Sequence, residues 1–346
     1  MSGRAPARIV ALGAGRMGRG IAHAFAYAGY SVTLIDLKKR AVDDLERLKA
    51  EALAEIDATL ASLAALGVFE DRHRAEIRAR VSVCGRDDAP VVLRDASVVF
   101  EGVPETIDMK AEAFAFACEH LAADAIVSST TSTILVTTLA DFVPNPERFL
   151  NGHWLNPAYL VPLVEVSPHA GTAPAVIERF TQLLQGIGKK TVLCKPAPGF
   201  IVPRMQSLIM NEAARMVQEG LATPEDVDTA VRYGLGFRYA NMGVVEFIDY
   251  GGVDILHYAG NYLADTLDER FRPPAIVAEH MANGRKGLRE GRGFYDWSNV
   301  DVPEYKRATL AKLVGMLRHQ GLLPPRSVAA SAATPTTTKP STRSRE

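Results

Sequence analysis

The sequence predicts an α/β fold, in which a doubly wound, mostly parallel sheet forms an N-terminal domain and an all-α domain follows it. Three observations lead to this prediction. An apolar run at residues 9–12 enters a glycine-rich turn and then a helix-like segment. Strand and helix patterns alternate as far as residue 194. Beyond a proline-rich stretch at 195–199, the periodic segments are mainly helical.

The first strand ends in a Gly-x-Gly-x-x-Gly pattern. Gly13 permits a tight turn, Gly15 lets the backbone approach a pyrophosphate, and Gly18 lets the following helix pack on the strand. The helix N-terminus then offers N–H groups and a positive dipole end to phosphates. The pattern therefore predicts a dinucleotide-binding domain of the Rossmann type, and the alternative is a glycine turn in another α/β protein. The cofactor contacts expected from this turn are Gly13, Gly15, Arg16, Met17 and Gly18.

A second strand, residues 31–35, stops at Asp36. Its carboxylate is placed to accept hydrogen bonds from both ribose hydroxyls, and it would repel a 2′-phosphate. The sequence therefore favours NAD over NADP. Three cations, Lys38, Lys39 and Arg40, follow closely and weaken that preference, unless they form the solvated first turn of a helix.

Composition excludes several classes of protein. The 346 residues are long enough for two domains, and 47% hydrophobic and 23% charged residues are typical of a globular protein. A net charge of −1 gives no argument for nucleic acid or for an anionic membrane. Three distant cysteines have neither metal-ligand spacing nor an even count for disulfides, so we expect no metal. No apolar run resembles a signal peptide or a membrane span, which makes a cytoplasmic location the default.

The segment 41–80 carries leucines at helical spacing and contains Gly67, which separates two predicted helices. It is longer than an ordinary crossover. Two interpretations remain open: a lid or substrate arm, and an inserted hairpin packed on the sheet.

The remaining elements follow from local periodicity. Further strands are predicted at 81–83, 97–101, 125–128, 149–152, 163–166 and 191–194. Helices are predicted at 107–121, 175–187, 204–219, 224–233, 253–267, 274–283 and 305–320. The predicted domains are residues 1–197 with the helical arm at 41–80, residues 198–322, and a disordered tail at 323–346 that is rich in Ser, Ala, Thr, Pro, Lys and Arg.

A histidine and a carboxylate on neighbouring strands are the candidate catalytic pair. His153 falls near the C-terminal end of a strand, the edge where α/β proteins bind ligands. Glu165 is an inward-facing acid on an otherwise apolar strand, and a buried acid needs a partner. Such a pair fixes the imidazole tautomer and raises its basicity, as a dehydrogenase requires for the hydroxyl proton. The alternative is a structural histidine.

Hydroxyls at 128–133 either bind a substrate oxygen or cap the next helix, and the local sequence favours capping.

Several motifs in order make the chain similar to the 3-hydroxyacyl-CoA dehydrogenase family, which includes 3-hydroxybutyryl-CoA dehydrogenase and the L-gulonate 3-dehydrogenase/λ-crystallin branch. The resemblance covers residues 7–297. Besides the glycine turn, the matching stretches are Glu101-Gly-Val-Pro-Glu105, Ser129-Thr-Thr-Ser132, His153-x-x-Asn156-Pro157, Pro162-Leu-Val-Glu165, Pro198-Gly199-Phe200 and Gly291-Arg-Gly-Phe-Tyr295.

The resemblance implies a role for each matching residue. His153 is the general base, Glu165 orients it, and Ser132 binds the substrate's hydroxyl oxygen. It also implies an NAD-binding domain, an all-helical domain that forms a homodimer, and a role in fatty acid metabolism. The residues that it places in contact with NAD are Asp36, Glu105, Lys110, Ser132 and Asn156, with Arg289 where the family has a lysine.

Three departures from the family bear on the substrate. Pro203 replaces an active-site asparagine, and Asn211, two turns along the same predicted helix, is a partial substitute or simply a helix residue. The arm has no basic residue between 61 and 68, where members that use CoA carry a lysine. Arg238 resembles the gulonate branch and suits a substrate carboxylate, unless it is a surface or interface arginine.

We therefore expect an NAD-dependent dehydrogenase that oxidises the 3-hydroxyl of an L-3-hydroxyacyl compound. The first candidate substrate is a thioester such as 3-hydroxybutyryl-CoA, and the alternative is a free 3-hydroxy acid related to L-gulonate or carnitine. A hypothesis from another class is a catalytically idle NADH-binding structural protein, against which the His153–Glu165 pair argues.

Overall fold

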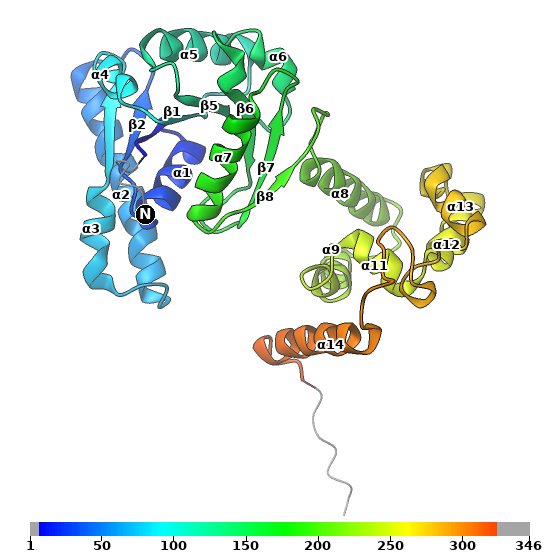
Figure 1. The fold of residues 1–346 in the computed structure, drawn as a ribbon. Coiled ribbons are helices and arrows are strands. Elements are labelled where there is room, and N and C mark those ends of the chain that lie inside the picture. Colours follow the sequence, from blue (N-terminus) through cyan, green and yellow to red (C-terminus); the bar gives the residue numbers. More distant parts are fainter. Residues whose placement is uncertain (1–6, 324–346) are drawn as a thin grey trace, which may run out of the picture. The chain divides into compact units, whose positions relative to one another are not determined.

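The computed structural model describes residues 7–323, which form two compact units, one ending at Asn211 and the other beginning at Glu212 (Figure 1). This division falls within α8 (Val202–Gln218), and the domain boundary after residue 197 stays a prediction. Glu165 accepts hydrogen bonds from the backbone of Ile201 and Val202, and these contacts tie the start of this helix to the first unit. Apart from residue 323, the predicted disordered tail lies outside the described residues.

The first unit contains one eight-stranded sheet with the order β3-β2-β1-β4-β5-β6-β7-β8. Every neighbouring pair is parallel except β6 and β7, which are antiparallel. The predicted doubly wound sheet is therefore confirmed. The strands are β1 (Ile9–Leu12), β2 (Val32–Asp36), β3 (Val81–Gly85), β4 (Val98–Glu101), β5 (Ile126–Ser129), β6 (Phe149–Trp154), β7 (Leu163–Pro168) and β8 (Lys190–Leu193).

Helices cover both faces of this sheet, because the central strands are buried on both sides. One face carries α1 (Arg16–Tyr27), α2 (Val42–Ala65), α3 (Arg74–Ala79) and α7 (Pro174–Gly186). The other carries α4 (Ala89–Arg94), α5 (Ile107–His120) and α6 (Val136–Ala140). Neither α4 nor α6 was predicted, since five or six residues show too little of the helical period.

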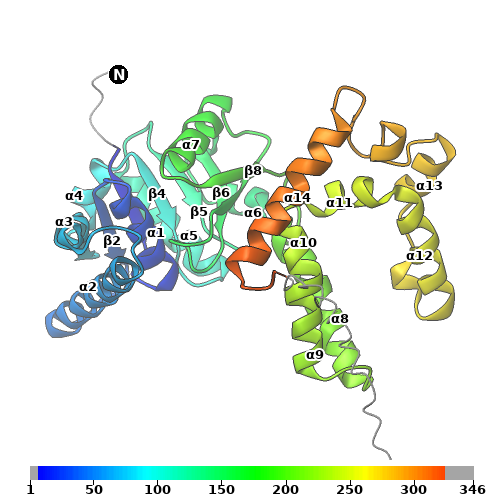
Figure 2. The same cartoon turned by 90° about the horizontal axis from the view of Figure 1, so that it is seen from below.

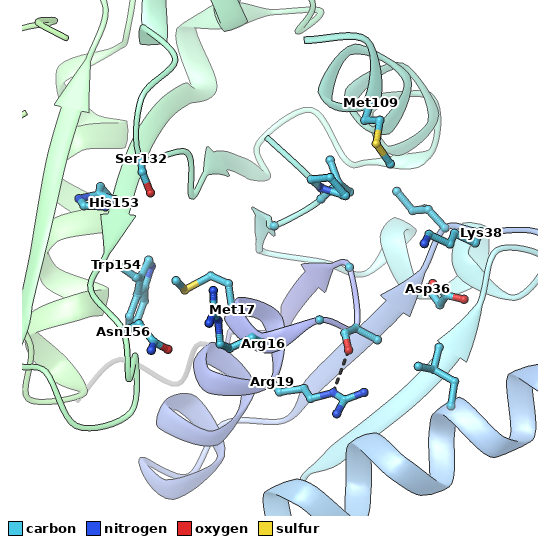
Figure 3. A pocket seen from close by; sticks show the side chains of 18 of the residues that line it. Arg16, Met17, Arg19, Asp36, Lys38, Met109, Ser132, His153, Trp154 and Asn156 are labelled. Atoms are coloured by element: carbon cyan, nitrogen blue, oxygen red, sulfur yellow. Dashed lines mark hydrogen bonds between the residues drawn. The ribbon is translucent and has the colours of Figure 1, made fainter. Parts of the chain in front are cut away.

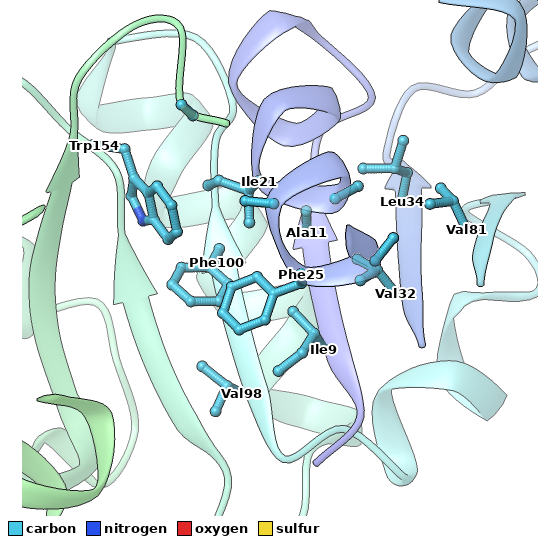
Figure 4. Close-up of a cluster of buried hydrophobic side chains, with 14 of the residues drawn as sticks. Ile9, Ala11, Ile21, Phe25, Val32, Leu34, Val81, Val98, Phe100 and Trp154 are labelled. Atoms are coloured by element: carbon cyan, nitrogen blue, oxygen red, sulfur yellow. The ribbon is translucent and has the colours of Figure 1, made fainter. Parts of the chain in front are cut away.

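The largest core cluster lies beneath α1 (Figure 4). Phe25 of α1 packs on Phe100 of β4 with ring centroids 5.4 Å apart, and Trp154 of β6 meets Phe100 edge-on at 5.8 Å. Aromatic pairs of this geometry add to the stabilisation from apolar burial. The core therefore fixes α1, and with it the glycine turn, against the strand that carries His153.

The segment 41–80 forms a helical pair in which α2 packs on the same face as α1. Ala52, Ile56 and Leu60 are buried in the core cluster, whereas Leu66 at the far end is 78% exposed. A 3₁₀ turn, Asp71–His73, precedes α3. The near part of the pair is thus packed on the sheet domain, and its far end is open to solvent.

The second unit is entirely helical in its regular structure, as predicted (Figure 2). It starts within α8 (Val202–Gln218) and continues with α9 (Pro224–Ala230), a π-helical turn (Val231–Gly236), α10 (Phe237–Tyr239), α11 (Val244–Gly251), α12 (Val253–Thr266), α13 (Ala275–Ala282) and α14 (Val302–His319). The helix α11 was not predicted. Among residues 7–323, no helix combines the length and apolarity needed to cross a bilayer.

A buried carboxylate organises the loop that follows α13. Asp249 of α11 accepts hydrogen bonds from the N–H groups of Phe294 (2.9 Å) and Tyr295 (2.8 Å) and from the Trp297 indole (2.8 Å). Its side chain satisfies three donors at once, so the Gly291–Tyr295 stretch is held on α11.

Candidate active site

A cavity of about 630 Å³ lies at the C-terminal edge of the sheet, between the glycine turn and the end of β6 (Figure 3). Such an edge is where doubly wound α/β proteins bind their ligands. Of the predicted site residues, those that line it are Gly13, Gly15, Arg16, Met17, Asp36, Ser132, His153 and Asn156. Elements far apart in the sequence thus converge on one cavity.

The glycine turn has the geometry that a bound pyrophosphate needs. Gly13 has a φ of +104°, and a Cβ on Gly18 would lie 2.1 Å from the Gly13 carbonyl oxygen. A Cβ on Gly15, by contrast, would stand in open space. Gly15 also provides no side-chain cap for α1, so the first N–H groups of the helix remain free for phosphate oxygens. The turn therefore fits the pyrophosphate of a dinucleotide.

His153 and Glu165 lie directly opposite each other in the antiparallel β6–β7 pair. The distance from His153 Nδ1 to Glu165 Oε2 is 2.7 Å, and both side chains are buried. Because Nδ1 is engaged by the carboxylate, Nε2 is left for a substrate. The predicted contact between these two residues is therefore present in the structure.

Two further contacts fix this pair, and sequence reasoning missed both. Glu165 Oε1 accepts hydrogen bonds of 2.9 Å from the backbone N–H groups of Ile201 and Val202, at the start of α8. The ring of Phe200 stacks on His153 at 5.1 Å with an angle of 7°. The Pro198-Gly199-Phe200 motif was the signal that could have identified them. Together they hold the carboxylate and the imidazole plane in one orientation.

Ser132 is positioned through its backbone. Its N–H donates to Glu105 Oε1 at 2.9 Å, and the Thr131 hydroxyl donates to the same carboxylate. Although burial acts in the opposite direction, the hydrogen bond from Thr131 and the charge of Lys110 hold the pKa of Glu105 below its usual value. Glu105 therefore stays ionised and anchors the loop that presents Ser132 to the cavity.

Lys110 is buried between two glutamates. Its Nζ lies 2.9 and 3.0 Å from the Glu101 carboxylate and 3.2 Å from Glu105. Burial raises the pKa of Glu101, and the Lys110 charge and a hydrogen bond from Ser129 oppose that shift. Glu105 and Lys110 do not line the cavity. Their contacts instead link the β4–α5 loop to the loop that carries Ser132.

Asn156 follows β6 in a loop that a buried lysine supports. Lys189 Nζ donates to the carbonyl oxygens of Ala158 (2.6 Å) and Val161 (2.7 Å), and burial lowers its pKa. Lys189 therefore anchors the loop that presents Asn156 to the cavity.

The remaining predicted residues are Asn211, at the end of the first unit, and Arg238 and Arg289, which belong to the second unit. Asn211 is exposed on α8. Arg238 donates to the Gly234 carbonyl and lies over the Phe247 ring at 4.8 Å. Arg289 is paired with Asp254 (3.1 Å) and Glu290 (2.7 Å). Within residues 7–323, no group of three or more His, Cys, Asp or Glu side chains is arranged to hold a metal ion.

A Rossmann-type domain with this glycine turn, Asp36, and a His–Glu pair at the cavity defines the class of NAD-dependent dehydrogenases. The model of the 3-hydroxyacyl-CoA dehydrogenase NAD binding domain matches residues 8–197, and that of the C-terminal domain matches residues 199–297. The chain belongs to the 3-hydroxyacyl-CoA dehydrogenase family and is an NAD-dependent oxidoreductase.

Relatives from bacteria and an archaeal structure agree with this assignment. The chain is 30% identical over 311 residues to 5-formyl-3-hydroxy-2-methylpyridine 4-carboxylate 5-dehydrogenase of Mesorhizobium japonicum, covering 90% of this chain and 97% of the relative. It is 32% identical over 291 residues to 3-hydroxybutyryl-CoA dehydrogenase of Bradyrhizobium diazoefficiens (84% and 95%). The crystal structure of the 3-hydroxyacyl-CoA dehydrogenase from Archaeoglobus fulgidus matches with a TM-score of 0.72 and 28% identity (92% and 100%).

Proposed function

We propose that the protein oxidises the 3-hydroxyl of an L-3-hydroxyacyl compound to the 3-oxo form, with His153 as general base and Glu165 as its orienting acid. The observation that carries the proposal is the 2.7 Å contact between His153 Nδ1 and Glu165 at the cavity that the glycine turn lines. NAD, when bound, accepts the hydride from the hydroxyl carbon. Arg16 and Met17, at the N-terminus of α1, belong to the cofactor side of this site.

The proton of the hydroxyl goes to His153. Glu165 accepts the Nδ1–H, so the lone pair of Nε2 faces the substrate and takes the proton as the C–H bond breaks. The resulting imidazolium is stabilised by the Glu165 carboxylate. Ser132, exposed in the cavity, donates its hydroxyl hydrogen to the substrate oxygen and orients the carbon to be oxidised.

For the substrate, a CoA thioester such as 3-hydroxybutyryl-CoA is the first candidate, because the family's motifs cover most of the chain. A free 3-hydroxy acid is the second. Two observations favour it: the arm has no cation between residues 61 and 68, and the Mesorhizobium relative is named for a free carboxylate substrate. Arg238 is the candidate carboxylate ligand in that case, and Asn211 is the candidate replacement for the amide lost at Pro203.

The substrate test is a screen of NAD reduction with L-3-hydroxybutyryl-CoA, free 3-hydroxy acids, L-gulonate and carnitine. A His153→Gln variant serves as the inactive control. Turnover of the thioester at micromolar KM, with no effect of Arg238→Ala, identifies the CoA enzyme. Turnover of a free acid, with KM raised about tenfold or more by Arg238→Ala, identifies the acid enzyme, since a lost charge-assisted contact is worth roughly 1.5–3 kcal/mol. No turnover of any 3-hydroxy compound would leave only the idle NADH-binding protein.

We infer that the protein is a homodimer formed through its helical unit, as the exposed apolar residues of that unit favour. We also infer a cytoplasmic location and a role in fatty acid metabolism. Three free thiols, Cys84, Cys118 and Cys194, are in keeping with a reducing compartment.

A further inference from the structure

The carboxylate expected to recognise the adenosine ribose already has a partner. Asp36 ends β2, is 6% exposed, and accepts a hydrogen bond from Nε of Arg40. Both residues line the cavity that the glycine turn opens into. The hydrogen bond to Asp36 raises the pKa of Arg40, and the more distant Asp44 and Glu51 act in the same direction. The negative charge of Asp36 is therefore balanced by a cation at contact distance.

Further cations surround this end of the cavity. Lys38 lines it beside Asp36 (Figure 3). A second cavity of about 400 Å³ adjoins the first, because both are lined by Leu37, Lys38, Val103 and Met109. Lys39 and Arg86 line this second cavity. Arg86 already donates to the Leu37 carbonyl (3.2 Å) and to Glu112 (3.1 Å), whereas among residues 7–323 the side chains of Lys38 and Lys39 make no hydrogen bond or ion pair.

The part of the cavity around Asp36, Lys38 and Arg40 is called the adenosine pocket below. The contacts of Arg40 and Lys38 change which ribose substituents this pocket excludes. A lone carboxylate rejects a 2′-phosphate by repulsion between like charges. Here one guanidinium N–H binds Asp36, and the four N–H groups on the two terminal nitrogens of Arg40 remain as donors of fixed geometry. A phosphate on the ribose would meet those donors and the Lys38 ammonium, and the repulsion would be offset.

We propose that Arg40 sets the cofactor selectivity of this chain, and that with Arg40 paired to Asp36 the adenosine pocket admits NADP as well as NAD. Asp36 binds the ribose hydroxyls of NAD. For NADP, Arg40 bridges Asp36 and the 2′-phosphate, and Lys38 is a second donor. The inference rests on the cavity and not on the substrate proposed above, so cofactor binding tests it even if that substrate is wrong.

The test is titration of the purified protein with NADH and NADPH, followed by nicotinamide fluorescence. The wild-type protein is expected to bind NADPH less than about a hundredfold more weakly than NADH. Loss of a charge-assisted contact in Arg40→Gln should raise the Kd for NADPH about tenfold or more and leave the Kd for NADH unchanged or lower. Lys38→Gln should weaken NADPH in the same direction by a smaller factor.

Arg47→Gln is the matched control, because Arg47 is an exposed arginine of α2, the helix that follows Arg40, and it pairs with Asp44 and does not line the cavity. It should change neither Kd by more than about twofold. Equal changes in NADH and NADPH affinity in Arg40→Gln would overturn the proposal. So would a wild-type protein that binds NADH but shows no measurable NADPH binding. Melting temperatures without cofactor identify any variant that fails to fold.

Discussion

His153 and Glu165 face each other across an antiparallel strand pair, and the carboxylate that contacts the imidazole is held from its other oxygen by the first amides of α8. Each Glu165 oxygen therefore has a separate task. Oε2 accepts from the imidazole, and Oε1 fixes the rotation of the carboxylate. The pair keeps the histidine in the tautomer whose Nε2 accepts a proton.

Glu165→Gln is predicted to lower kcat by roughly 10²–10⁴-fold while leaving the Kd for NADH nearly unchanged. The amide oxygen can still accept from Ile201 and Val202, but its NH₂ group then faces His153 Nδ1 and favours the tautomer with hydrogen on Nε2. Glu178→Gln, an exposed position on α7, is the control. A Glu165→Gln enzyme with wild-type kcat and pH–rate profile would show that the pair does not orient the base.

Gly15→Val is predicted to weaken cofactor binding without loss of fold. The new side chain would enter open space in the cavity, where the pyrophosphate is expected, so the Kd for NADH should rise at least about tenfold. Gly315→Val on the exposed face of α14, where a Cβ also meets nothing, is the matched control.

Gly18 gives the contrasting result at the same turn. A Cβ there would lie 2.1 Å from the Gly13 carbonyl oxygen, so Gly18→Ala is predicted to destabilise the fold in addition to weakening cofactor binding. Melting temperature separates the two effects. An unchanged NADH affinity in Gly15→Val would remove this turn from the cofactor site.

Several features of the fold and of the site could be predicted from the sequence because they are encoded locally. The Gly13–Gly18 turn, Asp36 and the alternation of strands lie in short runs whose period or spacing carries the information. The two residues of the His153–Glu165 pair are twelve positions apart, and their contact could still be predicted. They lie on consecutive strands that pair antiparallel, which places them opposite each other.

The contacts that could not be predicted from the sequence join residues that are far apart along the chain. Glu165 meets Ile201 at a separation of 36 residues, and Asp249 meets Trp297 at a separation of 48. The burial of Lys110 between Glu101 and Glu105 likewise follows from packing of α5 on the sheet and not from local pattern. The short helices α4, α6 and α11 escaped prediction because their periods are incomplete.

Asp249→Ala is predicted to destabilise the helical unit by roughly 3 kcal/mol, because one buried donor, the Trp297 indole, and two partly buried backbone N–H groups lose the acceptor that they share. Loss of the Trp297 contact should also shift the tryptophan emission. Asp265→Ala, which removes an exposed ion pair with Arg272, should cost less than about 1 kcal/mol. Chemical denaturation checks both. Similar losses in the two variants would mean that the Gly291–Tyr295 loop does not depend on Asp249.

His23 is predicted to make the fold sensitive to acid. Burial, aided by the charge of Lys189, lowers its pKa from 6.5 to about 4 in the folded chain. Between these values the unfolded chain binds a proton that the folded chain does not, so stability present above pH 6.5 is lost as the pH falls toward 4.

The contribution of His23 should reach roughly 2–3 kcal/mol at pH 4.5. His23→Gln removes the titrating group, and it should therefore lose that much less free energy of unfolding than wild type between pH 7 and pH 4.5. His73→Gln, at an exposed histidine, should behave as wild type. Parallel pH curves for wild type and His23→Gln would contradict the assignment.

The helical unit is predicted to form a two-fold dimer. On α12, Ile255, Tyr258 and Tyr262 recur at helical spacing and are 62%, 66% and 68% exposed, so they form an apolar stripe on one face. Large exposed apolar surfaces of this kind mark association sites, and homo-oligomers are most often two-fold dimers.

Light scattering should give twice the monomer mass at micromolar concentration. The double variant Tyr258→Asp/Tyr262→Asp should give the monomer mass, because two carboxylates would be buried without partners. Lys312→Asp, an exposed site on α14 with the same change in net charge, should remain dimeric. A monomeric wild-type mass would refute the dimer, and a double variant that keeps the dimer mass would place the interface on another face.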